Sequence, residues 1–369
     1  MRAQLKDMYN ERFLREFGEK VHNIYCNFNL ENFIDDIITD DWDDLPLKAR
    51  MRRITENLGQ HLPMCYEDAL KVLFSIDESC VGFPYLFFPD FVEVYGQEEE
   101  HWELSMKAIK RFTQRSSSEF AIRPFIVRDP DRVMNRMMIW ADHTNEHVRR
   151  LASEGCRPRL PWGMALQIFK KDPSKVLSIL EKLKSDHSLY VRKSVANNLN
   201  DIAKDNPDAV IDIAKRWINI NSHTDWILRK GCRTLIRDAN PEVMKLFGYA
   251  NFEDKELQIT EASIFVGPSE IKIGESCELR YELNIPKGES VHIRIEYGID
   301  FVKARGNVSR KLFLLSDKTV AGGTHISGTK THSFADLTVR RHYHGEHRIN
   351  LMVNGQEKAY ATLKIIDKL

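Results

Sequence analysis

The hydrophobic periodicity of this chain of 369 residues changes once, near residue 250. Before that point, apolar residues recur at every third or fourth position in stretches of about 10–17 residues bounded by Pro, Asn, Asp or Ser, a pattern typical of amphipathic helices. After it, apolar and polar residues alternate, as along residues 291–297, and alternation is typical of half-buried strands. We therefore predict an all-α domain over residues 1–250 and an all-β domain over residues 256–369.

The helical part contains a weak internal repeat, with HVRR at 147–150, YVRK at 190–193 and ILRK at 227–230. The arginines at 149, 192 and 229 are 43 and 37 residues apart, in the range of HEAT-type helix pairs. The helix before each copy opens near a proline, at Pro130, Pro173 and Pro207. The repeat predicts a HEAT-like solenoid, a fold that presents a concave surface to extended partners.

The β part carries a hairpin signal at Asn354-Gly355, between two stretches of alternating residues. About seven short strands in about 115 residues predict an antiparallel sandwich of the immunoglobulin type. We expect the boundary between the two parts within Gly248–Asp254.

Charge is distributed unevenly along the chain. The 54 Lys and Arg balance the 54 Asp and Glu, which excludes a highly basic protein that coats nucleic acid. Residues 1–100 hold 10 Lys and Arg against 21 Asp and Glu, a net of −11, whereas residues 101–250 hold 27 against 17, a net of +10. The middle segment therefore points to a polyanionic partner; the alternative is solvated helix faces of alternating sign.

The cysteines, the N-terminus and the apolar stretches indicate a cytoplasmic protein. None of the six cysteines has a metal-binding spacing, so they fit free thiols of a reducing compartment. The N-terminus is charged where a signal peptide needs an apolar run. The most apolar stretch, 81–89, contains two prolines and is too short to span a membrane.

The histidine-rich run 342–347 resembles a metal site, but alternation and a glycine turn favour a strand edge, so we expect no metal.

The second helix of each repeat has one apolar face and one charged face. The apolar column, at positions i, i+4 and i+8, contains Val148 and Ala152, then Val191, Val195 and Leu199, then Leu228, Cys232 and Ile236. Residues that lie about 200° around the helix from this column are charged or polar. They are Arg150 and Glu154, then Lys193, Asn197 and Asp201, then Lys230, Thr234 and Asp238, with Glu119 and Arg123 on an earlier helix. Ion pairing between positions i and i+4 would explain some of these pairs without any function.

Two further segments favour a functional surface. SEFAIRPF at 118–125 sets a carboxylate beside an aromatic residue near a helix start. In EGCRPRLPW at 154–162, a helix ends at Gly155 and a proline-stiffened loop carries two arginines and Trp162. Such a loop suits phosphate contacts and aromatic contact with a cation or a base. The alternative is a structural tryptophan beneath a solvated loop.

With these segments the chain resembles, over its whole length, the AlkC branch of the HEAT-like DNA alkylation-repair glycosylases, relatives of AlkD. The resemblance includes SEFAIRPF, LASEGCRPRLPW at 151–162, VRKSVANNLNDIAK at 191–204 and the C-terminal immunoglobulin-like domain. It implies a monofunctional glycosylase of base excision repair that removes 3-methyladenine and 3-methylcytosine from double-stranded DNA. It also implies that the damaged nucleotide is not flipped into a pocket, unlike in most glycosylases. We expect a monomer that needs no cofactor.

The resemblance implies catalytic roles for Glu119, Glu154, Asp201 and Trp162. A base alkylated at N3 is cationic and leaves as a neutral molecule, so its departure needs no general acid. The remaining demands are to stabilise an oxocarbenium-like sugar and to position water, both of which carboxylates meet in glycosidases. The π-face of Trp162 would contact the sugar or the cationic base.

Cations and one aromatic residue around this surface are candidates for DNA contact. They are Phe120, Arg123, Arg149, Arg150, Arg157, Arg159, Arg192, Lys193, Arg229 and Lys230. Arg149, Arg192 and Arg229 have the alternative of bracing loops between repeats, and Phe120 that of packing under the next helix. In the β part, residues 303–348 hold 9 Lys and Arg against 3 Asp and Glu, and the loop 322–325 exposes backbone, so we expect a second DNA contact there.

Two other functions remain possible on the sequence alone. A HEAT-repeat protein that recognises damaged or branched DNA without catalysis would keep the basic surface but would not need the three carboxylates. A protein-interaction scaffold is disfavoured by the net charge of +10 over residues 101–250.

Overall fold

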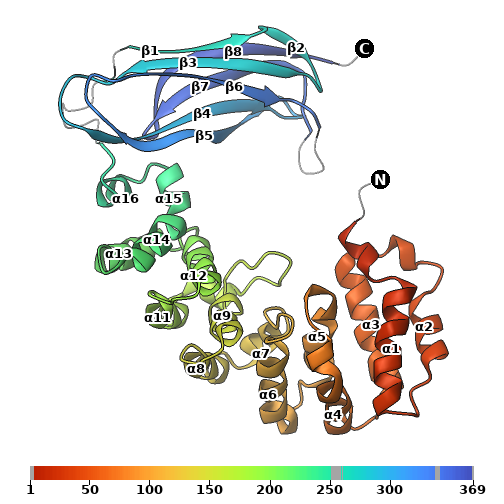
Figure 1. The fold of residues 1–369 in the computed structure, drawn as a ribbon. Helices are drawn as coiled ribbons and strands as arrows, with labels where there is room; N and C mark the ends of the chain where they lie inside the picture. Colours follow the sequence, from red (N-terminus) through yellow and green to blue (C-terminus); the bar gives the residue numbers. More distant parts are fainter. Residues whose placement is uncertain (1–3, 251–258, 260, 337–340, 368–369) are drawn as a thin grey trace. The chain divides into compact units, whose positions relative to one another are not determined.

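The computed structural model describes residues 4–250, 259, 261–336 and 341–367, and the chain divides into two compact units (Figure 1). The first unit comprises Met1–Val210 and Trp217–Gly231, and the second comprises Ile211–Arg216 and Cys232–Leu369. Among the described residues, no helix combines the length and hydropathy that crossing a membrane requires.

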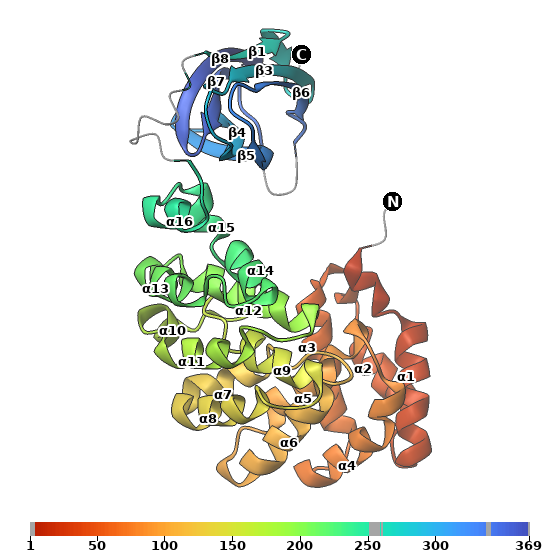
Figure 2. The same ribbon diagram turned by 60° about the vertical axis from the view of Figure 1, so that its left-hand side comes forward.

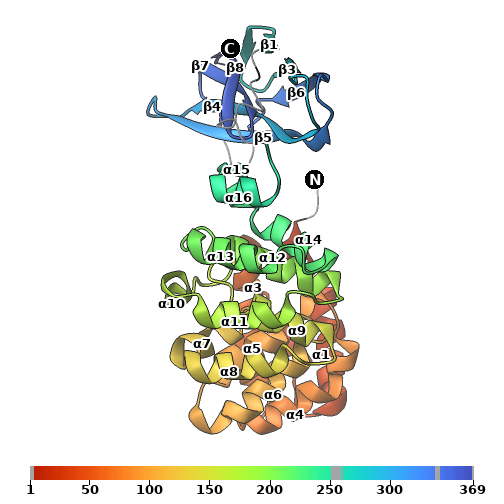
Figure 3. The same cartoon turned by 90° about the vertical axis from the view of Figure 1, so that its left-hand side faces the viewer.

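The first unit is built from helices that follow one another in chain order (Figures 1 and 3). Its N-terminal half contains α1 (Glu11–Ile24), α2 (Leu30–Ile37), α3 (Leu47–His61), α4 (Tyr66–Ile76), the 3₁₀ turn η4 (Phe83–Leu86), α5 (Phe87–Tyr95), α6 (Trp102–Phe112) and α7 (Ile122–Arg128). Next come α8 (Pro130–Trp140), α9 (Glu146–Glu154), α10 (Gln167–Lys171), α11 (Ser174–Leu183), α12 (Leu189–Ile202) and α14 (Ser222–Gly231). Between α12 and α14 in the chain comes α13 (Pro207–Trp217), of which Ile211–Arg216 belong to the second unit.

The predicted helix starts are confirmed in the three repeats. α8 begins at Pro130, with the side chain of Asp129 accepting a hydrogen bond from the Arg132 amide, and α13 begins at Pro207. Pro173 is the N-cap residue of α11. Proline suits the first helical position, as at Pro130 and Pro207, because its fixed φ matches a helix and its missing amide hydrogen has no intrahelical partner there.

The second helices of the repeats, α9, α12 and α14, lie side by side, with α12 in contact with both of the others. The predicted apolar column is buried, including Val148, Val195 and Leu228. At Gly231, a Cβ would stand 2.9 Å from the Cβ of Leu199, so glycine allows α14 to approach α12 closely. α14 ends at Gly231. The charged face predicted for the third repeat, from Lys230 to Asp238, therefore does not lie on one helix, because the chain continues into a separate helix, α15 (Arg233–Arg237).

Arg149 and Arg192 brace loops. Bracing was the alternative to DNA contact for these two residues in the sequence analysis. Arg149 donates to the carbonyls of His143 and Thr144 at 2.9 and 2.8 Å, and its Nε lies 2.6 Å from Asp186 Oδ2. Arg192 donates to the carbonyls of Asp186 and His187, both at 2.9 Å. Each arginine thus joins its own helix to the loop before it.

The second unit contains α15, α16 (Pro241–Leu246) and two β-sheets that face each other (Figure 2). The strands are β1 (Ala262–Gly267), β2 (Glu270–Lys272), β3 (Ser276–Asn284), β4 (Val291–Val302), β5 (Val308–Val320), β6 (His325–Ser333), β7 (Gly345–Val353) and β8 (Gln356–Ile366). One sheet has the order β1-β3-β6 and the other β2-β8-β7-β4-β5. All pairs are antiparallel except β2 with β8.

The alternation predicted for the strands places their apolar side chains between the sheets. On β4, Ile293, Ile295 and Ile299 are fully buried. The hairpin turn between β7 and β8 falls at Asn354 and Gly355, with φ of 46° and 81°, as its sequence predicted. The described residues of this part contain eight strands, one more than the seven or so expected, within the same sandwich architecture.

Residues after Gly231 pack with the β-sheets. The Tyr249 hydroxyl donates to Asp317 Oδ2 at 2.9 Å, and Asn354 Nδ2 donates to the Ala250 carbonyl at 2.9 Å. The expected boundary within Gly248–Asp254 lies partly outside the described residues, since 251–258 are not described.

Candidate active site

A cleft of about 640 Å³ lies in the first unit, and it brings together the segments that the sequence singled out. Its walls come from the turn before α7, from α9, from the loop that follows α9, from the start of α12 and from the segment around η4. Of the predicted residues, it is lined by Glu119, Phe120, Arg150, Glu154, Arg157 and Trp162.

Glu119 lies at one end of a chain of alternating charges in this cleft. Ser117 Oγ donates to Glu119 Oε2 at 2.6 Å, and the Arg150 guanidinium forms an ion pair with the same carboxylate. Arg150 Cζ stands 4.9 Å from the centre of the Tyr190 ring, and its Nη2 is 3.5 Å from Glu154 Oε1. Burial opposes the charge of Arg150, but Glu119 and Glu154 raise the pKa of its guanidinium above its ordinary value.

Glu154 and Asp201 lie deeper, on either side of Arg157. Arg157 Nη1 donates to Glu154 Oε1 at 2.7 Å, and its Nε donates to Asp201 Oδ2 at 2.8 Å. Lys204 adds a bond to Asp201 Oδ1 at 3.0 Å. Only 5% of Glu154 and 2% of Asp201 are exposed, so both are buried rather than lying on the open helix face that the spacing predicted.

The three carboxylates and two arginines thus form one connected set, Glu119–Arg150–Glu154–Arg157–Asp201, which we call the carboxylate–arginine chain. The residues come from the turn before α7, from α9 and its following loop, and from α12. Pairing with the arginines, and of Asp201 also with Lys204, offsets part of the cost of burying these carboxylates. The arrangement can stabilise a cationic centre and accept a proton from water.

Trp162 projects from the loop after α9. It is 63% exposed and has a φ of 63°, a conformation that few residues other than glycine adopt. Lys48 of α3 donates to the Trp162 carbonyl at 2.9 Å, and its ammonium lies 4.7 Å from the centre of the Phe120 ring. The loop therefore does not cover Trp162, in contrast to the alternative of a structural tryptophan beneath a solvated loop. Phe120 is half-buried beside it.

Arg123 holds this loop from beneath. Only 1% of it is exposed, and its guanidinium donates to the carbonyls of Met164, Gly155 and Arg157 at 2.7, 2.8 and 2.8 Å. Burial lowers the pKa of Arg123 to about 10. A guanidinium that is buried and bound to three carbonyls is not presented at the surface, so the structure assigns Arg123 to bracing this loop instead of the predicted DNA contact.

Two more of the predicted DNA contacts need the same correction. Arg149 and Arg157 are each 6% exposed, and their guanidinium groups are occupied by Asp186 and by Glu154 with Asp201. The remaining cations lie at or near the surface. Arg159 forms a two-bond ion pair with Asp205, at 2.8 and 2.6 Å, and Lys193, Arg229 and Lys230 are exposed on α12 and α14.

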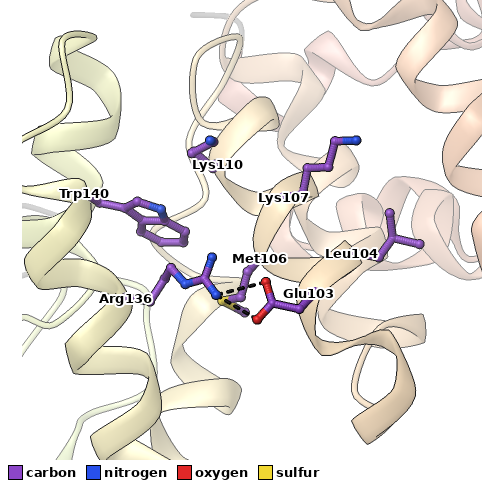
Figure 4. A pocket seen from close by; sticks show the side chains of 7 residues that line it. All are labelled: Glu103, Leu104, Met106, Lys107, Lys110, Arg136 and Trp140. Atoms are coloured by element: carbon purple, nitrogen blue, oxygen red, sulfur yellow. Dashed lines mark hydrogen bonds and ion pairs between the residues drawn. The ribbon is translucent and has the colours of Figure 1, made fainter.

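A second groove, between α6 and α8, holds none of the predicted catalytic residues (Figure 4). Arg136 donates to both carboxylate oxygens of Glu103 there, at 2.8 and 2.9 Å, and Lys107, Lys110 and Trp140 lie around the pair (Figure 4). Among the described residues, no group of three His, Cys, Asp or Glu is placed to hold a metal ion.

The sequence patterns did not reveal Ser117 and Tyr190, which line the cleft, or Lys48, which contacts Trp162 and Phe120 beside it. Tyr190 stands in the YVRK copy of the repeat, but the repeat pattern gave no reason to prefer its side chain over His147 or Ile227. Ser117 lies two residues before Glu119 in the sequence. Lys48 is 114 residues from Trp162 in the chain, and no local pattern signals such a contact.

Comparisons with known proteins show which family the chain resembles. Residues 95–235 match the family model of the DNA alkylation repair enzyme, and residues 260–367 match that of the C-terminal Ig-like domain of YhaZ. The uncharacterized protein YhaZ of Bacillus subtilis (strain 168) is 44% identical over 356 residues, which cover 96% of this chain and 98% of YhaZ.

A solved structure resembles the whole chain. The alkylpurine DNA glycosylase AlkC of Pseudomonas fluorescens, bound to DNA containing an abasic site analog, has a TM-score of 0.92 and 35% identity, over 99% of this chain and all of that one. This chain therefore belongs to the AlkC-type family of DNA alkylation-repair glycosylases with a C-terminal immunoglobulin-like domain.

Proposed function

We propose that this protein is a monofunctional DNA glycosylase of base excision repair, which hydrolyses the N-glycosidic bond of 3-methyladenine and 3-methylcytosine in double-stranded DNA. One observation carries the proposal: Glu119, Glu154 and Asp201, from separate helical segments, meet in the carboxylate–arginine chain beside the exposed Trp162. The AlkC relative is bound to DNA with an abasic site analog, which resembles the product of such a reaction.

The chemistry follows from the charge of the substrate. The electrons of the breaking C1′–N bond neutralise the cationic base, which leaves without a proton donor. The sugar becomes oxocarbenium-like, and the carboxylates stabilise its positive charge. Water then adds to C1′, and a carboxylate accepts its proton.

The shape of the site supports excision without base flipping. Trp162 and Phe120 stand at the cleft surface and not at the bottom of an enclosed pocket. We propose that the helices of residues 1–250 form a HEAT-like solenoid along which a monomer holds the duplex, through Arg159, Lys193, Arg229 and Lys230. Residues 256–369 would act as a second DNA-binding domain.

A non-catalytic DNA-binding protein is the second candidate, because each carboxylate has an arginine partner and so has a structural explanation. Release of free bases from methylated duplex DNA, followed by chromatography, separates the two. We expect release by the wild type and a fall of about 10²–10⁴ in the single-turnover rate for Glu154→Gln.

The matched control is Asp205→Asn, which removes a carboxylate from the surface pair with Arg159 and should keep the wild-type rate. Melting curves are needed beside the rates, since Glu154 is buried and its neutralisation also affects folding. A fully folded Glu154→Gln variant with the wild-type rate would argue against catalysis by this carboxylate.

A further inference from the structure

Two lysines in the groove between α6 and α8, Lys107 and Lys110, form no ion pair with any residue that the structure describes (Figure 4). Glu103 lies four residues before Lys107 on α6, a spacing at which a glutamate and a lysine commonly pair. Its carboxylate instead accepts hydrogen bonds from Arg136 of α8, at 2.8 and 2.9 Å. The lining of the groove thus combines three cations with one carboxylate, and the charge of the two lysines is left over.

The positive charge of this groove also acts on the turn after α8. Burial and the neighbouring charges of Lys110 and Arg149 lower the pKa of the His143 imidazole, which favours its neutral form. Lys107 and Lys110 are three residues apart, so they project from one face of α6. A carboxylate that enters the groove can therefore pair with both lysines.

An apolar wall lies beside the lysines. Figure 4 shows the ring of Trp140 on the α8 side of the groove, and Leu104 and Met106 complete the lining from α6. Trp140 is 3% exposed, so its ring is a fixed wall. An aromatic or aliphatic side chain that enters the groove would contact this ring and lose contact with water, which favours binding.

The groove is short, and carboxylates stand at both ends of α8. Asp131 near its start and Asp142 just after its end are largely exposed and pair with Lys175 and Lys182 of α11. α8 has 11 residues, so about 16 Å separate its ends. That is roughly the length of five residues of an extended peptide. A DNA duplex carries phosphate charges along its whole length and would meet the two aspartates, so the groove suits a short acidic ligand better.

We propose that the groove between α6 and α8 docks a short acidic segment of a partner protein. The carboxylates of this segment pair with Lys107 and Lys110, and one aromatic side chain packs against Trp140. Among the described residues, the groove and the cleft have no lining residue in common. A partner in the groove therefore leaves the cleft open. The proposal depends on α6 and α8 and not on the proposed glycosylase function.

The probe is a fluorescein-labelled peptide of sequence EEFDE with blocked ends, and its fluorescence anisotropy is measured. We expect saturable binding with a Kd on the order of 100 µM at about 50 mM salt, and weaker binding at higher salt because exposed charges are screened. The peptide EEGDE, which lacks the aromatic ring, should bind about fivefold more weakly, since it buries less apolar surface.

The variant Lys107→Ser/Lys110→Ser tests the two cations. It should weaken binding about tenfold, because two exposed ion pairs with the peptide are lost. Lys107 is exposed and Lys110 is half-buried, so the variant should fold. The matched control, Lys175→Ser/Lys182→Ser, removes the same charge from α11, where each lysine already pairs with an aspartate. It should keep the affinity within about twofold, since only distant, screened charges change.

Trp140 reports where the peptide binds. The chain has six tryptophans, and Trp140 lines this groove. Unlabelled EEFDE should shift the intrinsic fluorescence of the wild type. Trp140→Phe, which keeps an aromatic wall, should bind with an affinity within about threefold of the wild type but lose most of the shift. A shift of equal size in Trp140→Phe would place the peptide elsewhere and overturn the proposal.

Unmethylated duplex DNA at saturating concentration separates a protein partner from a nucleic acid. We expect the peptide to keep its affinity beside DNA, because the groove and the cleft are lined by different residues. Displacement of the peptide by DNA would overturn the proposal and assign the groove to DNA binding. No saturation up to about 1 mM peptide, or equal losses for the two double-lysine variants, would also overturn it.

These titrations do not measure base release. A protein that binds the peptide but releases no base from methylated DNA would refute the proposed glycosylase function and leave the docking groove standing. A failed peptide titration would leave the proposed function unchanged.

Discussion

Arg157 joins Glu154, which lines the cleft, to the buried Asp201, and the charge pattern of the sequence did not reveal this link. Spacing along α9 and α12 placed Glu154 and Asp201 on the face opposite the apolar column. The helix periodicity correctly gave the side of each helix from which the two carboxylates project, but it does not show which other segments pack over that side. The loop after α9 turns back over these carboxylates, because Arg123 binds its carbonyls, and so an expected surface became a buried ion pair.

Replacement of Arg157 should therefore affect folding strongly. Arg157→Met leaves Glu154 and Asp201 buried without their shared partner, and breaking a buried pair in this way costs about 3–5 kcal/mol. Urea unfolding measures the loss. Arg159→Met, which removes the exposed ion pair with Asp205, should cost less than about 1 kcal/mol. Equal losses for the two variants would contradict a special role for the buried pair.

Arg159 itself is the sharper probe of DNA binding. If it contacts a phosphate, Arg159→Ala should weaken binding to all duplex sequences alike and lower the slope of log K against log salt by about one unit. Binding titrations at several salt concentrations give the slope. Lys71→Ala, an exposed lysine paired with acidic neighbours on α4, is the control and should leave the slope unchanged. Weaker binding with an unchanged slope would instead indicate that Arg159 positions the Trp162 loop.

At the scale of elements, the sequence predicted the helices, the β-hairpin turn and the position of the Trp162 loop. Each depends on local signals, such as Pro130 at a helix start or Asn354-Gly355 in a turn. Contacts between distant segments were not predictable in this way. Lys48 reaches the Trp162 carbonyl from α3, and Tyr190 reaches Arg150 from α12, through packing that no single segment encodes.

Strand β7 contains a pH-sensitive element at His347. The residue is fully buried, burial lowers the pKa of its imidazole, and Nε2 accepts a hydrogen bond from the Val302 amide at 3.3 Å. The folded state therefore favours the neutral ring, so this stabilising contribution is complete above the unfolded pKa of about 6.5 and is lost as the pH falls below it.

The expected outcome is a lower free energy of unfolding for the β-sheet unit at pH 5.5 than at pH 7.5. Urea titrations at both pH values, monitored by the β-sheet signal, measure it. His347→Gln, which cannot take up the proton, should show a smaller difference between the two pH values. The same difference in wild type and variant would assign the effect to other groups.

At the scale of the whole molecule, the change of periodicity near residue 250 correctly separated a helical part from a β part. It did not predict that α15 and α16 belong to the compact unit that contains the sheets. Helical periodicity reports only that these segments are helices. Their place depends on tertiary contacts, such as the Tyr249 hydroxyl with Asp317 and Asn354 with the Ala250 carbonyl.

A chain that ends at residue 250 tests the division of labour between the two parts. It retains the cleft. In the proposed HEAT-like solenoid each repeat packs mainly on its neighbours, so the helical circular dichroism of the short chain should persist. Loss of the sheets exposes Tyr249, so some stability should be lost with it. DNA affinity should fall, since a second binding domain acts through effective concentration, while the single-turnover rate at saturating enzyme should fall less. If the short chain binds DNA as tightly as the full chain, the β part is not a DNA clamp. If it binds but releases no base at saturation, the β part helps to form the catalytic complex, because the cleft and all three carboxylates are still present.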